Sequence, residues 1–313
     1  MPIATIGIPV YQGENYLDET LQAARAQDYG ALEIVVADNA STDATPEIIA
    51  SHVAVDDRVR VITNPENLGA AENYNIAFRE SRGKYFAWNA HDDYTSPDFI
   101  SEGVKVLEND PTAVIAFGRL VIVDAIGQRR EDKELPVPEG LRSPSPAVRF
   151  RATARGAPEI VVFGLIRSST LKTTDLHGAF TGSDRNLVAE LMLHGTAVQA
   201  GDSEFYLRHH DQRSVRLIDQ AESRFSHPRE AWFAPQRAGK IVFPGWRRLG
   251  GYIEAVRRSK HLSPAERMAC YWAIVQLLVD DRMKLSKYLV KDIITALLQA
   301  AGPRFKAPAI DDA

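Results

Sequence analysis

Two adjacent carboxylates, Asp92 and Asp93, follow an apolar, aromatic segment within GKYFAWNAHDDYTSPDF, residues 83–99. Neighbouring carboxylates repel each other, so either helix capping or a bound cation is needed to explain the pair. Capping explains it poorly, because Ser96 followed by Pro97 already suits the start of the next helix. A hard divalent cation offsets the repulsion and typically combines one or two carboxylates with substrate phosphate oxygens. The pair therefore indicates a site for Mg²⁺ or Mn²⁺ and a diphosphate.

Two other segments carry candidate binding residues. In VVADNASTDATPE (35–47), Asp38 stands at the expected end of a strand, where its carboxylate can accept an N–H group of a base; turns and a Thr45 cap explain the later residues. In NPENLGAAENYN (64–75), Gly69 at a helix start can bring backbone N–H groups close to an anion. A helix entry that needs a small residue explains this glycine equally well.

The second half of the chain adds an acid and a basic segment. Asp184 lies at the start of an expected helix in FTGSDRNLVAELMLHG (180–195), where an acid is also favourable through the helix dipole alone. The segment FYLRHHDQRSVR (205–216) contains paired histidines and three arginines. Its simplest interpretation is an exposed charged segment after a strand.

These residues depend on the elements that position them. Short apolar runs rich in β-branched residues predict strands at 4–10, 32–38, 59–64, 84–89 and 113–124. Helical spacing and start signals predict helices at 15–27, from Thr45-Pro46, at 69–81 and at 97–110. This alternation indicates a mostly parallel sheet with helices on both faces, which binds ligands at the carboxyl ends of its strands. Asp38, Asn64 and the Asp92-Asp93 pair should then share one edge.

The remaining segments are less regular. The Pro- and Arg-rich stretch 125–157 is expected to be a long, mobile surface loop. A strand and helix start are expected in 159–171, and a helix closed by Gly195 in 183–195. From about residue 220 the pattern is helical, with Pro264 opening a long apolar-periodic segment.

Composition narrows the function classes. The 313 residues carry a net charge of −4, which gives no reason to expect a nucleic-acid partner. A single cysteine, Cys270, excludes an internal disulfide and a cysteine-built zinc site, and fits a reducing cytosol. Neither a signal peptide nor an apolar run of spanning length is visible. We therefore expect a soluble, cytoplasmic protein that can touch the inner face of a membrane.

Four segments together resemble the nucleotide-sugar-binding half of glycosyltransferase family 2: IGIPVYQGENYLDETLQA, EIVVADNASTDAT, NLGAAENYN and KYFAWNAHDDYTSPDF. Each is weak alone, but four in the right order and spacing are specific. The similarity covers residues 3–125 well and extends to about 215. It implies an inverting enzyme with the GT-A fold, whose catalytic domain spans 1–218 (donor half 1–125, acceptor half 126–218), followed by a helical region at 219–313.

The resemblance also implies roles for individual residues. Pro9, Val10 and Tyr11 would line the base pocket, Asp38 would accept from the imino N–H of the base, and Asn67 and Gly69 would flank the nucleotide. The full set of expected nucleotide-sugar contacts is Pro9, Val10, Tyr11, Glu14, Asp38, Asn67, Gly69, Asn75, His91 and Asp92. The expected ligands of Mn²⁺ or Mg²⁺ are Asp92, Asp93 and His210. Ala90 stands where the family usually has the first Asp of its metal motif, so the metal and ribose contacts fall to Asp92 and Asp93.

The implied catalytic base is Asp184, next to Ser183, where many family members have Glu. Arg208 or Arg213 would approach phosphate oxygens. The expected reaction is transfer of a sugar from a nucleotide-diphosphate sugar to a saccharide or lipid-linked acceptor, with inversion, in cell-surface polysaccharide or glycolipid synthesis. Two alternatives stay open: a catalytically inactive nucleotide-sugar-binding protein, and a sugar-phosphate nucleotidyltransferase. The acidic, aromatic loop PVYQGENYLDE disfavours the second, which needs a Gly-rich, basic loop.

The C-terminal helices combine basic residues with Trp246, Tyr252 and Trp272. Packing against the catalytic domain, or a contact in a homodimer, is the simpler explanation. A membrane-surface anchor that meets a lipid-linked acceptor is the functional one.

Overall fold

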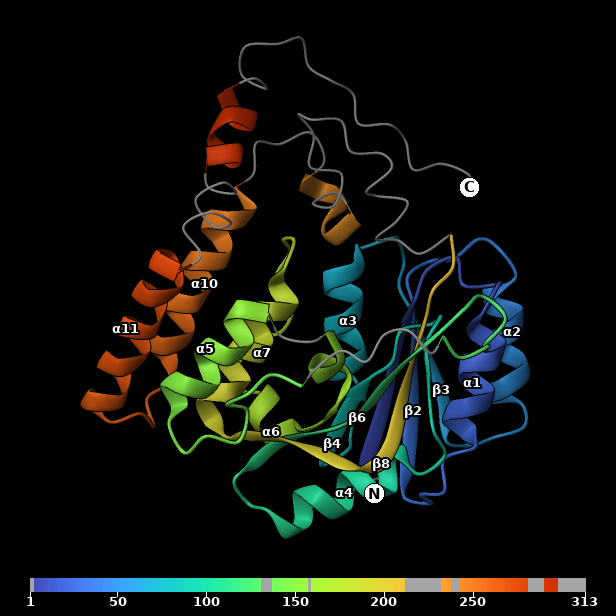
Figure 1. Cartoon of the computed structure of the whole chain (residues 1–313). Helices are drawn as coiled ribbons and strands as arrows, with labels where there is room; N and C mark the ends of the chain where they lie inside the picture. Colours follow the sequence, from blue (N-terminus) through green and yellow to red (C-terminus); the bar gives the residue numbers. More distant parts are fainter. Residues whose placement is uncertain are drawn as a thin grey trace.

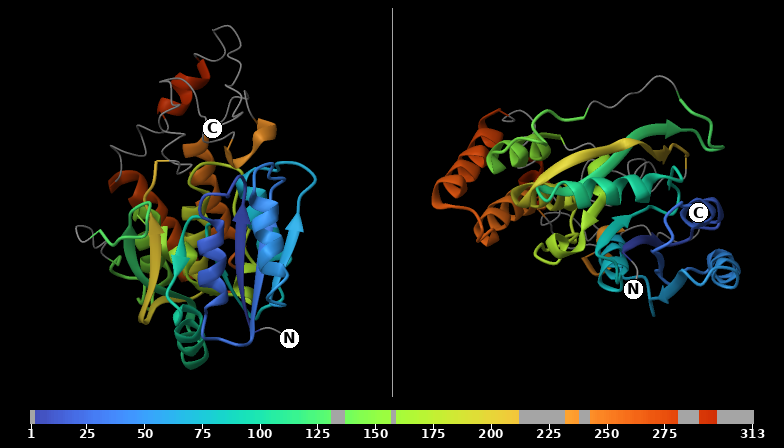
Figure 2. Two further views of the ribbon diagram at one scale, coloured as in Figure 1. Left: turned by 90° about the vertical axis from the view of Figure 1, so that its right-hand side faces the viewer. Right: turned by 90° about the horizontal axis from the view of Figure 1, so that it is seen from below.

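The computed structural model describes residues 3–130, 137–156, 159–211, 232–237, 243–280 and 290–297. An eight-stranded sheet of order β3-β2-β1-β4-β7-β6-β8-β5 forms its centre, with helices on both faces (Figures 1 and 2). The strands are β1 (Ala4–Val10), β2 (Leu32–Asp38), β3 (Val59–Thr63), β4 (Tyr85–Trp88), β5 (Tyr94–Thr95), β6 (Ala113–Val123), β7 (Leu165–Arg167) and β8 (Thr196–Arg208). The helices are α1 (Leu17–Arg25), α2 (Thr45–Val53), α3 (Ala70–Arg79), α4 (Phe99–Asn109), α5 (Pro146–Gly156), α6 (Ser168–Leu171), α7 (Ser183–His194), α10 (Pro244–Arg258) and α11 (Pro264–Asp280), with 3-10 turns η1 (Glu159–Phe163) and η2 (Pro235–Arg237).

The first four strands in space, β3, β2, β1 and β4, are parallel. Every residue of β1, β2 and β4 is buried, which explains why these strands read as continuous apolar runs rather than alternating ones. Their carboxyl ends meet at one edge because all four run in the same direction. Beyond β4 the sheet is mixed: β7 is antiparallel to both β4 and β6, β8 is parallel to β6, and β5 is antiparallel to β8.

The stretch predicted as a surface loop, 125–157, contains helix α5, so that prediction is wrong in part. Pro146 opens the helix, and a proline in the first turn is favourable because its missing N–H would have no partner there. Phe150 is fully buried, and the buried Arg149 donates through Nε to the Met192 carbonyl of α7 (2.9 Å). Tertiary contacts with α7 therefore order a segment whose composition suggested a loop.

Two predicted helix caps are also wrong. The hydroxyl of Thr45 accepts the Gly13 N–H (2.8 Å) from the loop after β1. Thr45 is itself the first residue of α2, and its N–H donates to Asp43 Oδ1 (3.1 Å). The hydroxyl of Ser96 accepts the Glu204 N–H of β8 (2.9 Å), while α4 begins only at Phe99. Both hydroxyls join segments that are distant in the sequence, a use that local start signals cannot reveal.

The C-terminal helices pack against the α/β part through a core of their own. This cluster takes buried residues from α5, α7, α10 and α11, among them Phe150, Leu193, Tyr252 and Ile274. An ion pair between Arg258 of α10 and the buried Glu190 of α7 (2.9 Å) joins the same elements. The predicted domain boundary at 218/219 lies outside the described residues. None of the described helices is both long enough and apolar enough to cross a bilayer.

The reactivity of the only cysteine of the chain can be used to test how the C-terminal helices pack. Cys270 is fully buried within α11, and burial raises the pKa of its thiol to about 11. Since the thiolate is the reactive form, we expect an aromatic disulfide reagent to label native protein very slowly and denatured protein fast and completely. Rapid stoichiometric labelling in native buffer would contradict the packing of α11 on α5 and α10.

Candidate active site

The carboxyl ends of the parallel strands lie side by side, as the sequence predicts. The Asn39 N–H donates to the Val10 carbonyl at the end of β1 (2.9 Å), and the Asn64 N–H donates to the Asp38 carbonyl at the end of β2 (2.8 Å). Asp38 is the last residue of β2 and is only 2% exposed. One oxygen of its carboxylate accepts the Ser41 N–H (3.1 Å). The carboxylate is thus held at the strand edge by the loop that follows it.

A network of asparagine side chains organises this edge. Asn64 Nδ2 donates to Asn39 Oδ1 (2.9 Å) and Asn73 Oδ1 (3.0 Å), and Asn39 Nδ2 donates to Asn67 Oδ1 (2.8 Å). Asn39, Asn64 and Asn73 are all buried, so these bonds also satisfy amide groups that would otherwise be costly to bury. Asn67 was predicted to contact the nucleotide, whereas the other three were not predicted as organisers of this edge. For Asn39 and Asn64 the available signal was an asparagine directly after a strand; Asn73 lies within α3 and carried no such signal.

Gly69 is the residue before α3, with a φ of +86° that favours glycine. Its N–H donates to Asn67 Oδ1 (2.9 Å). A Cβ here would lie 2.6 Å from the backbone oxygen of Phe233, in the segment 232–237 that lies over the start of α3. Backbone conformation and this close approach explain the glycine without a bound anion.

Other predicted nucleotide contacts are distributed around the same edge. Pro9 and Val10 are buried in β1, while Tyr11 directly after them is 39% exposed. Glu14 is exposed, and its carboxylate accepts the Ala44 N–H (3.2 Å). These residues come together through the loops after β1 and β2.

Asn75 has a different environment from the other predicted contacts. It is buried in α3, and its side chain makes two 2.9 Å hydrogen bonds with the backbone N–H and carbonyl of His177. Asn75 therefore fastens the loop before α7 to α3.

The two adjacent acids have separate partners. Asp93 is 2% exposed, and its Oδ1 accepts the backbone N–H of Arg208 (2.8 Å), while its carbonyl accepts from Thr20 Oγ1 (2.9 Å). The Asp92 side chain is 15% exposed and lies 3.0 Å from Nε2 of His210. Different partners therefore separate the two carboxylates: Asp93 joins the motif to β8, and Asp92 is the more accessible acid.

Arg208 is a structural residue rather than the predicted phosphate contact. Its side chain is 1% exposed; Nε donates to the Asp92 carbonyl (3.0 Å), and the guanidinium pairs with Glu19 and lies over the Tyr16 ring (4.8 Å to the centroid). Because the guanidinium is buried with these partners, it does not face a phosphate group, and the prediction that Arg208 approaches phosphate oxygens is wrong. The other candidate, Arg213, lies outside the described residues. Glu19 and Tyr16 were missed, although the beginning of a helix that follows β1 must lie near this edge.

His210 and Asp92 have the chemistry of a metal site. His210 is 6% exposed, its ring lies 4.4 Å from that of Tyr16, and its buried Nδ1 has no hydrogen-bond partner within the described part of the chain. A carboxylate and an imidazole suit Mn²⁺, so the donor set fits. Among the described residues, no three His, Cys, Asp or Glu side chains are grouped to hold an ion. Substrate oxygens and water would therefore complete a shell built on Asp92.

The neighbouring His91 lies at the same loop. Its carbonyl accepts the Thr20 hydroxyl (2.8 Å), and a Cβ at Gly13 would lie 3.1 Å from its ring. Gly13 thus leaves room for the imidazole beside the loop that follows β1.

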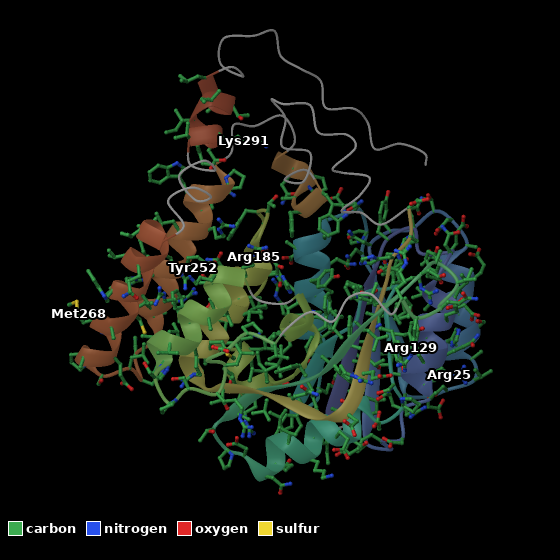
Figure 3. All side chains as sticks on the ribbon, viewed as in Figure 1. Arg25, Arg129, Arg185, Tyr252, Met268 and Lys291 are labelled. Carbon is green, nitrogen blue, oxygen red and sulfur yellow. The ribbon has the colours of Figure 1, made fainter. Side chains whose placement is uncertain are left out.

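Asp184 is the second residue of α7, which begins after Gly182, a residue with φ of +83°. In the same turn, Asn186 Nδ2 donates to the Arg248 carbonyl of α10 (2.9 Å). Figure 3 shows Arg185, the next residue, at the level of the start of α3. The start of α7 thus brings an acid toward the end of the sheet at which the parallel strands finish.

His177 packs between aromatic rings beneath this region, 5.1 Å from Tyr74 and 4.8 Å from Trp88 between centroids. Burial lowers its pKa to about 4, from an ordinary value near 6.5. Between these values the unfolded chain binds a proton that the folded chain does not. The free energy of unfolding therefore falls as the pH drops from about 6.5 to about 4, by up to ~3 kcal/mol from this residue.

Replacing His177 with phenylalanine keeps an aromatic ring and the backbone bonds to Asn75 but removes the titration. We expect the decrease in Tm between pH 7 and pH 5 to be smaller in His177→Phe than in the parent protein, as measured by circular dichroism melts. An equal decrease in both proteins would contradict the assignment.

Comparison with known proteins identifies relatives of the α/β part. The sequence model of "Glycosyl transferase family 2" matches residues 5–190. An uncharacterized glycosyltransferase of Rickettsia prowazekii is 34% identical over 124 residues, which are 39% of this chain and 38% of the relative. One from Haemophilus influenzae is 31% identical over 128 residues, 40% of each chain. The matches thus span less than half the length of these relatives, and 18% of another from Rickettsia bellii.

Solved structures match more of the chain. A structure of S. aureus TarS in complex with UDP-GlcNAc aligns with a TM-score of 0.56 at 15% identity, covering 95% of this chain and 89% of that one. The mannosyltransferase PcManGT from Pyrobaculum calidifontis, in complex with GDP-Man and Mn²⁺, aligns with a TM-score of 0.52 at 19% identity, covering 95% and 87%. At these identities the likeness shows the fold alone. It is the GT-A fold, as the sequence resemblance implied.

Proposed function

Because the chain belongs to glycosyl transferase family 2, we propose that it is a glycosyltransferase that moves a sugar from a nucleotide-diphosphate sugar to a hydroxyl group of a saccharide or lipid-linked acceptor. One observation carries the proposal: the buried Asp38, at the end of β2, and the Asp92–His210 pair, which follows β4 and β8, lie at the same edge of the sheet. The former suits a base, and the latter suits a divalent metal ion that would bind a diphosphate. We place the reaction in cell-surface polysaccharide or glycolipid synthesis, on the cytoplasmic side of the membrane.

The donor would lie with its base at Asp38. A carboxylate with one oxygen fixed by Ser41 can accept the imino N–H of a base with the other. Tyr11, partly exposed directly beyond β1, would add an aromatic surface beside that base. The remaining expected donor contacts would come from the loops that this edge brings together.

Asp92 and His210 would hold Mn²⁺ or Mg²⁺. When bound, such an ion offsets the negative charge that develops on the departing diphosphate. Asp93 and Arg208 would not contact the ion. Their hydrogen bonds would hold the backbone of Asp92 in place. This arrangement assigns different tasks to two acids that are neighbours in the sequence.

Asp184 would be the catalytic base. As the acceptor oxygen forms its bond to the anomeric carbon, the bond from that carbon to the diphosphate breaks, and the acceptor proton passes to the Asp184 carboxylate. A carboxylate suffices for this because the hydroxyl becomes acidic only as the new bond forms. A single displacement inverts the anomeric centre, so an α-linked donor would give a β-linked product.

A screen of nucleotide-diphosphate sugars tests this function. A donor present at 100 times its Kd should stabilise the protein by about 2.7 kcal/mol, which a thermal shift assay detects, and we expect the shift to require Mn²⁺ or Mg²⁺. The same donor should then be consumed when acceptor saccharides are added. Stabilisation without any turnover would favour the inactive nucleotide-sugar-binding protein, for which Ala90 in the metal motif is the supporting observation.

A further inference from the structure

The loop after β4 is held by buried side chains at four consecutive backbone carbonyls, those of residues 90–93. The first and the last of these carbonyls accept from Asn89 Nδ2 (3.0 and 2.9 Å). The second and the last lie within hydrogen-bond distance of the Thr20 hydroxyl (2.8 and 2.9 Å), and the third accepts from Arg208 Nε (3.0 Å). Carbonyls that turn away from water need such donors, so the backbone that carries Asp92 is fixed on both sides.

One face of α1 contacts this loop. Tyr16, directly before the helix, and Glu19 and Thr20 within it have the i, i+3, i+4 spacing of neighbours on a helix surface. The Thr20 N–H donates to the Tyr16 carbonyl (3.2 Å), so Tyr16 belongs to the same helical ladder. Glu19 pairs with the guanidinium of Arg208, and the Tyr16 ring lies 4.4 Å from the ring of His210. The same helix face therefore supports both the loop after β4 and the histidine beyond β8.

The hydroxyl of Thr20 serves this loop rather than its own helix. Threonine is a poor helix former, and the hydroxyl of a helical threonine often bonds to the carbonyl four residues earlier. Thr20 is only 1% exposed, and its hydroxyl instead reaches carbonyls 71 and 73 residues away in the sequence. The other buried residues of α1 are apolar: Leu17, Leu21 and Ala24. Valine would fill the same space, so what threonine adds at this position is the bond to the loop.

We propose that Thr20 is a positioning residue for the metal site, an inference that rests on the proposed role of Asp92 and His210. Its hydroxyl holds the carbonyls of the residues on either side of Asp92, and this keeps the Asp92 carboxylate 3.0 Å from His210 Nε2 before an ion binds. Ligands that are already in place lose less conformational freedom on binding, which raises the affinity for the ion. Thr20 itself would not contact the ion.

The test is the affinity of the full chain for Mn²⁺ alone, measured from the electron paramagnetic resonance signal of free Mn²⁺. Thr20→Val keeps the shape of the side chain and removes the hydroxyl. Residues that support a metal ligand typically contribute about 10–100-fold to metal affinity, so we expect Thr20→Val to bind Mn²⁺ at least about tenfold more weakly. Thr20→Ser keeps the hydroxyl and should bind nearly as tightly as the parent protein.

Hydrogen exchange measured without metal gives a second readout of the same effect. The backbone amides of residues 90–96 should exchange faster in Thr20→Val than in the parent protein, because the loop opens more easily when its carbonyls lose a donor. Thr20→Ser should exchange at the parental rate. Circular dichroism melts establish that each variant is folded. If Thr20→Val does not fold, Thr20→Ala takes its place, since alanine favours the helix.

The matched control is Thr153→Val, which removes a hydroxyl with similar bonds elsewhere. Thr153 is fully buried in α5, and its hydroxyl donates to the carbonyls of Arg149 (3.1 Å) and Phe150 (3.0 Å). Figure 1 places α5 and α1 on opposite sides of the molecule. The control should therefore be less stable than the parent protein but keep its affinity for Mn²⁺.

The inference is wrong if a folded Thr20→Val binds Mn²⁺ as tightly as the parent protein, or if Thr153→Val loses as much affinity as Thr20→Val. It is also wrong if Thr20→Ser loses as much as Thr20→Val, because the methyl group and not the hydroxyl would then matter. In these three cases the parent protein still binds Mn²⁺, so the proposed function stands. A parent protein that binds no Mn²⁺ would instead count against the metal site of the proposed function, and the inference would fall with it.

Discussion

Replacing Asp184 with asparagine is expected to lower the rate of sugar transfer by about 10²–10⁴-fold, the usual contribution of a general base. Asparagine has nearly the same shape but cannot take the acceptor proton. Donor binding should change little, because the proposed donor contacts lie at the carboxyl ends of β1 to β4, in the loops that follow them and in α3, rather than at the start of α7. Initial rates at saturating donor measure the first effect, and the donor-induced thermal shift measures the second.

The matched control for this variant is Asp202→Asn, which makes the same chemical change at an exposed position of β8. It should transfer at the parental rate. If Asp184→Asn turned over normally, Asp184 would not be the base. A loss of activity together with loss of folding would be recognised by melting, and Asp184→Glu, which keeps the carboxylate, should then recover part of the rate.

Replacing Asp92 with asparagine is expected to have the other large effect. Removing a charged ligand should cost several kcal/mol of stabilisation of the departing diphosphate, which corresponds to a rate lower by at least about 100-fold. The apparent affinity for Mn²⁺ should fall with it. Asparagine can still bond to His210, so the fold should persist. Transfer rates titrated against Mn²⁺ give both quantities.

The variant Asp93→Asn distinguishes the role of Asp93 from that of Asp92. Asp93 is buried and bonds to the backbone of β8, so we expect its replacement to lower the stability by about 1–3 kcal/mol. The Mn²⁺ dependence should change less than in Asp92→Asn. If Asp93→Asn had the larger effect on Mn²⁺ affinity and the smaller effect on the melting temperature, the assignment of the two acids would have to be reversed.

The parallel half of the sheet follows from the sequence because three of its four strands, β1, β2 and β4, are buried on both faces. The runs 4–10 and 32–38 coincide with β1 and β2, since continuous β-branched, apolar stretches leave little choice of environment. The shared edge for Asp38 and Asn64 follows in turn from strand direction. The local residue pattern and the common direction of the strands were sufficient to predict this half of the sheet.

The partners of buried polar residues could not be predicted in the same way. Arg208 reads as one more cation in a basic segment, and only contact with Glu19 and Asp92, far away in the sequence, makes its burial favourable. Likewise, nothing in the sequence distinguishes Asp92 from Asp93. Their separate environments arise because β8 brings a backbone N–H to Asp93, and the chain just beyond β8 brings His210 to Asp92.

The most direct test of the account is a crystal structure of the protein with its nucleotide-diphosphate sugar and Mn²⁺, recorded with the anomalous signal of manganese. We predict the manganese peak within coordination distance of the Asp92 carboxylate and of the diphosphate oxygens, with the base against Asp38. A donor bound elsewhere, with manganese and diphosphate both away from Asp92, would contradict it.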